Sequence, residues 1–249
     1  MNLYEVVKNG MRTSLRRAGI ELARTKWIKR LMSLSASRRA TTLRYHGIQT
    51  VLDVGANVGQ YAAEIREWGF QGRIISFEPT SAAFKALSER ASADAHWSVF
   101  NLAVGAEDGV AAINVSSNAG LSSSFMPMLE LHKHIYPEAN YVATEKVAVT
   151  TLDSALADMI TPDEALMLKM DVQGFEHFVL GGATSILSQV RLIECELSFV
   201  PLYEGQLVFP QMLALLDTLG FQLVGFNNVT SNPESGHCLQ IDGIFARKQ

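Results

Sequence analysis

Short β-rich runs alternate with helical segments along most of this 249-residue chain, and this alternation restricts the fold more than any other feature. The predicted strands are Thr50–Val54, Arg73–Phe77, Trp97–Val104, Leu166–Met170, Val190–Leu197, Phe221–Phe226 and Gln240–Ala246. The predicted helices are Gln60–Trp68, Ser81–Ala91, Glu176–Leu187 and Phe209–Leu219. This order predicts an α/β fold with a mainly parallel sheet and helices on both of its faces. A short turn-rich loop joins the last two strands, so we expect an antiparallel final hairpin at the sheet edge.

An insertion of about residues 110–150 interrupts the alternation. Val110–Val115 and Glu145–Thr150 have the composition of strands, and the irregular segment between them is rich in Ser, Met, His and Pro. A loop of that length inside a compact domain is usually functional. The hydroxyls of residues 122–124 are candidates for contact with a cofactor or an acceptor, and a simple serine-rich loop is the alternative.

Charge is distributed unevenly along the chain. Residues 1–50 contain eleven Lys or Arg and two Asp or Glu, whereas the remainder contains ten and twenty-three. We therefore expect a basic amphipathic helical extension over residues 1–44, followed by the main domain over 45–249. The extension fits peripheral contact of residues 1–40 with an anionic membrane, or a helical cap whose basic face is in solvent. The acidic main domain argues against nucleic-acid binding, which needs Lys and Arg along the surface.

Cysteine content and hydropathy indicate a cytoplasmic protein. Cys195 and Cys238 form no C-x-x-C pair, so we expect free thiols in a reducing compartment. No apolar run approaches the ~20 residues that span a bilayer. The basic N-terminus also lacks the apolar stretch of a secretory signal. The alternative location is peripheral, at the inner membrane face, through the N-terminal extension.

A glycine turn follows the first strand, at a point where a bare backbone can approach a ligand closely. Its pattern is D-x-G-x-x-x-G, which lacks the third glycine of the dinucleotide-binding array. The candidate cofactor-binding residues of this turn are Asp53, Gly55, Asn57 and Gly59. Asp53 would reach the amino acid moiety of S-adenosylmethionine (SAM), directly or through water, and Gly55 would leave room for its methionine part.

Glu78 and Pro79 complete the cofactor prediction. Glu78 ends the second strand, 25 residues after Asp53, where a carboxylate can accept hydrogen bonds from both ribose hydroxyls. Glu78 alone fits NAD or SAM, whereas its combination with Pro79 and the two glycines favours SAM. Asn101, at the end of the third strand, is a candidate for the adenine edge, with the capping of a turn as the alternative.

Six blocks in this order resemble the FkbM family of SAM-dependent methyltransferases. They are VLDVGANVG (51–59), ISFEP (75–79), NLAVG (101–105), VTTLD (149–153), LKMDVQGFE (168–176) with LGGA (180–183), and QIDGIF (240–245). The resemblance covers about residues 45–247. It implies a seven-stranded class I (Rossmann-like) methyltransferase fold and O-methylation, often of sugars or natural-product hydroxyls. Many members have D-V-E-G where this chain has Gln173, so a second acid is absent two residues after Asp171.

Asp171 and Glu196 are the candidate catalytic residues at strand ends, because ligands of such sheets bind outside the carboxyl ends of the strands. A hydroxyl acceptor needs a general base or a divalent metal that lowers its pKa, and either carboxylate could serve as the base or coordinate the metal. The alternative for Asp171 is structural: it would shape the next turn and pair with Lys169. His132 and His134 lie in the insertion, and their near-neutral pKa values suit base catalysis.

These features predict a SAM-dependent O-methyltransferase that acts on a hydroxyl of a sugar, a glycolipid or another natural product. Its partner would be a small-molecule or lipid-linked sugar acceptor, and the basic N-terminus would help it meet a lipid-linked sugar at the membrane. One alternative is a nicotinamide-dependent oxidoreductase, against which the missing glycine counts. The other is a SAM-binding protein without catalytic activity.

Overall fold

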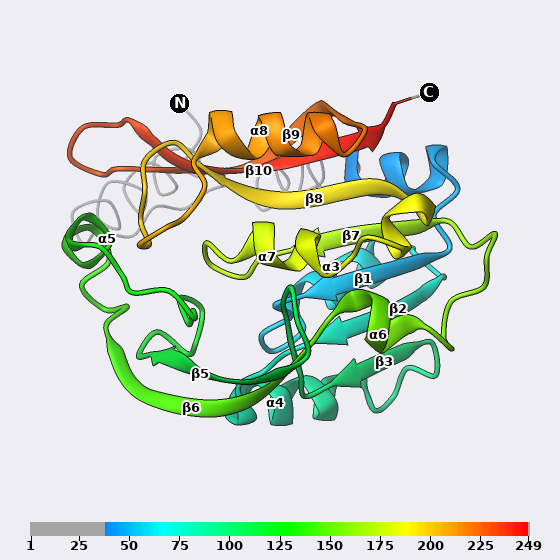
Figure 1. Cartoon of the computed structure of the whole chain (residues 1–249), viewed down its shortest axis with the longest axis horizontal. Coiled ribbons are helices and arrows are strands. Elements are labelled where there is room, and N and C mark those ends of the chain that lie inside the picture. Colours follow the sequence, from blue (N-terminus) through cyan, green and yellow to red (C-terminus); the bar gives the residue numbers. More distant parts are fainter. Residues whose placement is uncertain (1–37, 249) are drawn as a thin grey trace, which may run out of the picture. The chain divides into compact units, whose positions relative to one another are not determined.

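The computed structural model describes residues 38–248, and the chain divides into two units, Met1–Arg39 and Ala40–Gln249. The second unit contains a seven-stranded sheet in the order β3-β2-β1-β7-β8-β10-β9 (Figure 1). Its strands are β1 (Thr50–Val54), β2 (Arg73–Phe77), β3 (Trp97–Phe100), β7 (Leu166–Met170), β8 (Val190–Ser198), β9 (Phe221–Ser231) and β10 (Cys238–Arg247). All neighbouring pairs are parallel except the two made by β10, with β8 and with β9. The predicted parallel sheet and final antiparallel hairpin are therefore confirmed.

Helices cover both faces of this sheet. The described helices are residues 38–45, α3 (Gln60–Glu67), α4 (Ser81–Ala91), α5 (Glu130–Ile135), α6 (Leu152–Leu156), α7 (Glu176–Gly181), the 3-10 helix η1 (Ile186–Gln189) and α8 (Phe209–Thr218). One core cluster joins the sheet to α6, α7, η1 and α8, and a second joins it to α3 and α4. Leu168 lies in the first cluster and Met167 in the second, because successive residues of a strand point to opposite faces.

The insertion forms a sheet of its own, in the order β4-β6-β5. β5 (Gly109–Ser116) and β6 (Tyr141–Thr150) are antiparallel, and β4 (Ala103–Val104) pairs in parallel with the end of β6. Figure 1 shows β5 and β6 in green, curving together, with α5 in the connection between them. The two strands predicted in the insertion are therefore confirmed.

The prediction of one continuous strand over Trp97–Val104 is wrong. β3 ends at Phe100, and β4 belongs to the other sheet. The side-chain amide of Asn101 holds the chain at this break, because it donates to the carbonyl oxygens of Glu78 and Pro79, both at 2.9 Å. These bonds show Asn101 within a turn, and its contact with an adenine edge stays a prediction.

The helix predicted over Glu176–Leu187 is wrong in its second half, because α7 ends before Gly182. A Cβ atom at Gly182 would lie 2.0 Å from the carbonyl oxygen of Gly105, so the two backbones are in close contact there. The carboxylate of Asp153 then accepts a hydrogen bond from the backbone N–H of Ile186 at 2.9 Å, at the start of η1. Tertiary contacts therefore divide the predicted helix in two.

The predicted N-terminal extension lies almost entirely outside the described residues, so its helical structure and its membrane contact stay predictions. The division between the two units falls between Arg39 and Ala40. Within residues 38–248, every helix is too short or too polar to cross a lipid bilayer.

Candidate active site

A cavity opens at the carboxyl ends of β1, β2 and β7. Its volume is about 620 Å³ with the open mouth included. The turns after these strands contribute Gly55, Asn57, Glu78, Pro79, Asp171 and Gln173. The insertion contributes Gly120, Leu121, Ser123, Ser124 and Phe125. The insertion therefore forms part of the wall, and two residues of its serine run face the cavity.

The two glycines of the turn have different neighbours. Gly55 has a φ of +75°, and a Cβ atom there would lie 1.9 Å from the carbonyl oxygen of Asp171. Gly59 has a φ of +80°, and its Cβ would lie 2.8 Å from the ring of Trp97. Gly55 lines the cavity and Gly59 does not. The first glycine therefore lets the ends of β1 and β7 meet at the cavity, while the second makes room for the core.

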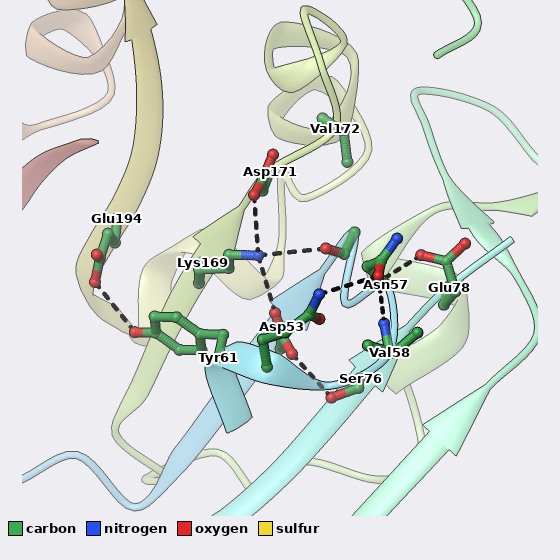
Figure 2. Close-up of polar contacts among 12 residues, drawn as sticks. Asp53, Asn57, Val58, Tyr61, Ser76, Glu78, Lys169, Asp171, Val172 and Glu194 are labelled. Atoms are coloured by element: carbon green, nitrogen blue, oxygen red, sulfur yellow. Dashed lines mark hydrogen bonds and ion pairs between the residues drawn. The ribbon is translucent and has the colours of Figure 1, made fainter. Parts of the chain in front are cut away.

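Glu78 is fixed at the cavity wall by three hydrogen bonds. Its Oε2 accepts from the backbone N–H of Asn57 at 2.9 Å (Figure 2). Its Oε1 accepts from the N–H and the hydroxyl of Thr80 at 2.9 and 2.6 Å. Burial raises the pKa of Glu78, although the bonds from Thr80 and Asn57 act in the opposite direction. A carboxylate has about four lone-pair sites, so Oε2 can still accept a bond from a ligand hydroxyl.

Asp53 is fully buried and does not line the cavity. Its Oδ2 accepts from the hydroxyl of Ser76 at 3.1 Å, and its Oδ1 lies 3.2 Å from Nζ of Lys169. The same ammonium donates to the carbonyl of Gly55 at 3.3 Å and lies 3.8 Å from Oδ2 of Asp171 (Figure 2). Burial opposes the charge on Lys169, but the carboxylates of Asp53 and Asp171 outweigh it and raise the pKa of Lys169. One ammonium thus links the glycine turn to the carboxylate after β7.

Asp171 is the accessible carboxylate of the cavity, with 46% of its side chain exposed. Its backbone N–H donates to the carbonyl of Val54 at 3.0 Å, which fixes the main chain at the end of β7. Its Oδ1 accepts from the side-chain amide of Gln173 at 2.8 Å. Asp171 therefore combines a fixed backbone with an accessible carboxylate at the cavity wall.

Glu196 lies on β8, the strand next to β7, and does not line the cavity. It is half-buried and accepts a hydrogen bond from the side-chain amide of Gln240. Burial, together with the nearby carboxylates of Asp171 and Glu176, holds the pKa of Glu196 well above its ordinary value. Among residues 38–248, no group of three or more His, Cys, Asp or Glu is placed to hold a metal ion. The predicted metal role of Asp171 and Glu196 therefore finds no third ligand there.

The two candidate histidines, both on α5, are placed away from the cavity wall. His132 is buried, its Nε2 lies 3.2 Å from the hydroxyl of Tyr203, and burial lowers its pKa. His134 is exposed, with its Nε2 3.7 Å from the carboxylate of Glu234. The structure therefore brings neither imidazole to the cavity.

Two residues that connect these elements were not predicted to do so. Tyr203 lies fully buried between β8 and α8, and its hydroxyl donates to Oε1 of Gln173 at 2.7 Å. The hydroxyl of Ser124 donates to the backbone carbonyl of Gln173 at 2.8 Å. Ser124 belongs to the serine run noted in the insertion, whereas a single tyrosine outside every motif carries no signal in the sequence.

Residues 53–223 match the sequence model of the methyltransferase FkbM domain. The 2-O-methyltransferase NoeI of Sinorhizobium fredii is 26% identical over 231 residues, which cover 90% of this chain and 93% of that protein. A precorrin-6y C5,15-methyltransferase structure from Geobacter metallireducens aligns with a TM-score of 0.47 and 10% identity, over 86% of this chain and 87% of that one. A 1,6-didemethyltoxoflavin-N1-methyltransferase structure from Burkholderia thailandensis aligns with a TM-score of 0.44 and 13% identity, over 99% and 89%.

Proposed function

Because the chain belongs to the methyltransferase FkbM family, we propose that it transfers the methyl group of SAM to a hydroxyl oxygen, with Asp171 as the general base. The observation that carries this proposal is the single cavity that joins the glycine turn, Glu78 and the accessible Asp171 carboxylate. The S. fredii relative bears the name of a 2-O-methyltransferase, which supports oxygen as the methylated atom.

The residues at one side of the cavity fit the cofactor. Glu78 has an acceptor site left on Oε2 for a ribose hydroxyl, and the bonds from Asn57 and Thr80 hold that oxygen in place. Gly55 lines the same cavity and lets the ends of β1 and β7 meet there. When bound, SAM supplies a methyl group activated by its sulfonium.

Asp171 would act on the acceptor at the other side. Asp171 would take up the proton of the acceptor hydroxyl while the acceptor oxygen bonds to the methyl carbon and the carbon–sulfur bond breaks, with the electron pair going to the sulfur of S-adenosylhomocysteine. Base assistance of this kind contributes roughly 10²- to 10⁴-fold to a rate. Lys169 stays an ammonium, because it lies between the carboxylates of Asp53 and Asp171.

The acceptor in this proposal is a sugar, a glycolipid or another hydroxylated natural product. Leu121 and Phe125 give the insertion's part of the wall an apolar character, while Ser123 and Ser124 add hydroxyls. Such a mixed wall suits a molecule with apolar faces and several hydroxyls. For a lipid-linked sugar, residues 1–40 would supply the membrane contact. Co-sedimentation with anionic vesicles, with and without residues 1–40, tests that part of the proposal.

Calorimetry tests the cofactor. We expect S-adenosylhomocysteine to bind and NAD not to bind. Glu78→Ala should weaken binding of S-adenosylhomocysteine roughly 10- to 100-fold, the effect of losing a hydrogen bond to a charged group. The matched control is Glu89→Ala, which removes an exposed carboxylate on α4. Binding of NAD instead of the thioether would overturn the assignment.

Turnover tests the base. Formation of S-adenosylhomocysteine is measured with a panel of glycosides, hydroxylated fatty acids and polyketides. Asp171→Asn should lower kcat by about 100-fold or more while binding of S-adenosylhomocysteine is kept. The exposed Asp158→Asn serves as control. Normal turnover of Asp171→Asn would show that Asp171 is structural, and binding without turnover of any acceptor would favour a SAM-binding protein without activity.

A further inference from the structure

The turn after β7 contains an unusual backbone at the position where this chain departs from the D-V-E-G pattern. Gln173 has a φ of +54°, and Gly174 after it has a φ of +96°. Glutamine rarely adopts the left-handed conformation, and such strain persists only where the surroundings fix it. Ser124 supplies one such restraint through its bond to the carbonyl of Gln173. The side chain of Gln173 supplies the others.

Both ends of the Gln173 amide are hydrogen-bonded. Nε2 donates to Oδ1 of Asp171 at 2.8 Å, and Oε1 accepts from the hydroxyl of Tyr203 at 2.7 Å. The carboxylate of Asp171 has only acceptor oxygens, so the NH₂ group must face it and Oε1 must face Tyr203. The chemistry of the two neighbours therefore fixes the orientation of the amide.

The same reasoning extends one step further from the cavity. The Tyr203 hydroxyl lies 2.7 Å from Oε1 of Gln173 and 3.5 Å from the carbonyl oxygen of Ser122, so its single proton goes to the nearer acceptor, Gln173. Nε2 of His132, 3.2 Å from the hydroxyl oxygen, then carries a proton and donates it. Burial lowers the pKa of His132, which favours the neutral ring with its proton on Nε2. In this series of hydrogen bonds, His132 donates to Tyr203, Tyr203 donates to Gln173, and Gln173 donates to Asp171. Each bond polarises and strengthens the next.

The His132 end of this series of hydrogen bonds is buried, and its Asp171 end is accessible. Tyr203 and His132 are 0% and 2% exposed, whereas Gln173 and Asp171 line the cavity. Tyr203 packs with Met126, Met128 and neighbouring residues in the core of the insertion. An accessible aspartate alone rotates freely about its side-chain bonds, so a connection to a buried anchor restricts it.

We propose that Gln173 and Tyr203 are positioning residues, which brace the Asp171 carboxylate in one orientation toward the acceptor, with His132 as the buried end of the brace. This inference rests on the proposed base role of Asp171. The brace transmits orientation and not a proton, because a carboxamide such as that of Gln173 acts neither as an acid nor as a base near neutral pH. The brace also explains why position 173 has an amide, because a carboxylate there cannot donate a hydrogen bond to Asp171 and would repel it.

Tyr203→Phe tests the brace, because it removes the hydroxyl and keeps the ring in the core. We expect kcat to fall roughly 10- to 100-fold, as misplacement of a catalytic group does, with KM for the acceptor unchanged. The matched control is Tyr141→Phe. The Tyr141 hydroxyl donates to the carbonyl of Met126 at 2.6 Å and packs on the same core cluster, but it is outside the brace. Equal loss of kcat in both variants would overturn the proposal.

Two substitutions of Gln173 sharpen the test. Gln173→Met keeps the length of the side chain and removes both hydrogen bonds, so adding Tyr203→Phe to it should lower kcat no further. Losses that multiply would mean that Tyr203 acts independently of Gln173. Gln173→Glu should also lower kcat, although glutamate is the residue that many family members have at this position. Full activity of Gln173→Glu would contradict the need for an amide donor.

A readout that needs no acceptor is the solvent exchange of the Gln173 side-chain amide protons, measured by NMR on the complex with S-adenosylhomocysteine and assigned through Gln173→Met. Tyr203→Phe should speed up this exchange, and Tyr141→Phe should not. Unchanged exchange in Tyr203→Phe overturns the brace alone. Normal turnover of Asp171→Asn overturns the base assignment alone, so the two failures are distinguishable.

Discussion

Replacing Gly55 by alanine tests whether the contact between the ends of β1 and β7 organises the site. Two effects add. Gly55 has a φ of +75°, and the left-handed conformation costs an alanine about 1–2 kcal/mol. The new Cβ would also lie 1.9 Å from the carbonyl oxygen of Asp171, whereas real Cβ contacts exceed 3.0 Å. One strand end must therefore move by about 1 Å, and overpacking of this kind costs about 1–3 kcal/mol.

The two effects together should lower the free energy of unfolding by about 2–5 kcal/mol, a large part of the 5–15 kcal/mol that stabilises a typical domain. Gly69→Ala is the matched control. Gly69 has a φ of +89° but no heavy atom within 4 Å of the position of a Cβ. It should show the backbone effect alone, about 1–2 kcal/mol.

Urea unfolding followed by circular dichroism gives the free energies, and calorimetry gives the affinity for S-adenosylhomocysteine. Gly55→Ala should be less stable than Gly69→Ala and should also bind the thioether more weakly, because its strand end moves at the cavity. The reasoning is refuted if the two variants unfold at the same urea concentration, or if Gly55→Ala binds as tightly as the parent protein.

Two further predictions concern buried charge. Lys169→Met leaves the carboxylate of Asp53 buried beside an apolar group, so the free energy of unfolding should fall by about 3–5 kcal/mol. Adding Asp53→Asn should restore part of the lost free energy of unfolding, as measured by urea unfolding. Burial raises the pKa of Glu176 to about 7 from 4.5, so the folded chain holds this proton more tightly than the unfolded one. Stability should therefore fall by about 3 kcal/mol as pH rises from about 4.5 to 7. Glu176→Gln should flatten this slope, because an amide does not titrate in this range. The amide oxygen can keep both hydrogen bonds, since both backbone donors bind the same oxygen of Glu176. An unchanged slope would contradict the assignment.

Elements defined by local pattern were predictable from the sequence. Thr50–Val54, Arg73–Phe77 and Leu166–Met170 are strands with those bounds, because hydropathy and β-propensity act over a few neighbouring residues. The break at Asn101 and the break at Gly182 were not predictable, since each depends on residues distant in the sequence. An apolar run does not reveal which of two sheets it joins.

The candidate site divides in the same way. Gly55, Glu78 and Asp171 were predicted because each directly follows a strand, and the structure brings them to one cavity. Asp53 belongs to the same motif, yet its carboxylate contacts the buried residues Ser76 and Lys169 and does not line the cavity. Motif membership alone does not tell which side of a turn a side chain faces. Contacts such as that of Tyr203 depend on tertiary packing, which no spacing along the chain encodes.

The pairing of β4 with β6 in the second sheet has a consequence for the length of the insertion. The polypeptide enters the insertion through β4 and leaves it through the end of β6. These two segments pair directly, Ala103 with Val149 and Val104 with Thr150. Entry and exit are therefore adjacent, so a longer or shorter insertion changes the closure entropy little. The sheet β4-β6-β5 also shares no strand with the main sheet. The length of this segment can therefore change without altering any strand pair of the main sheet.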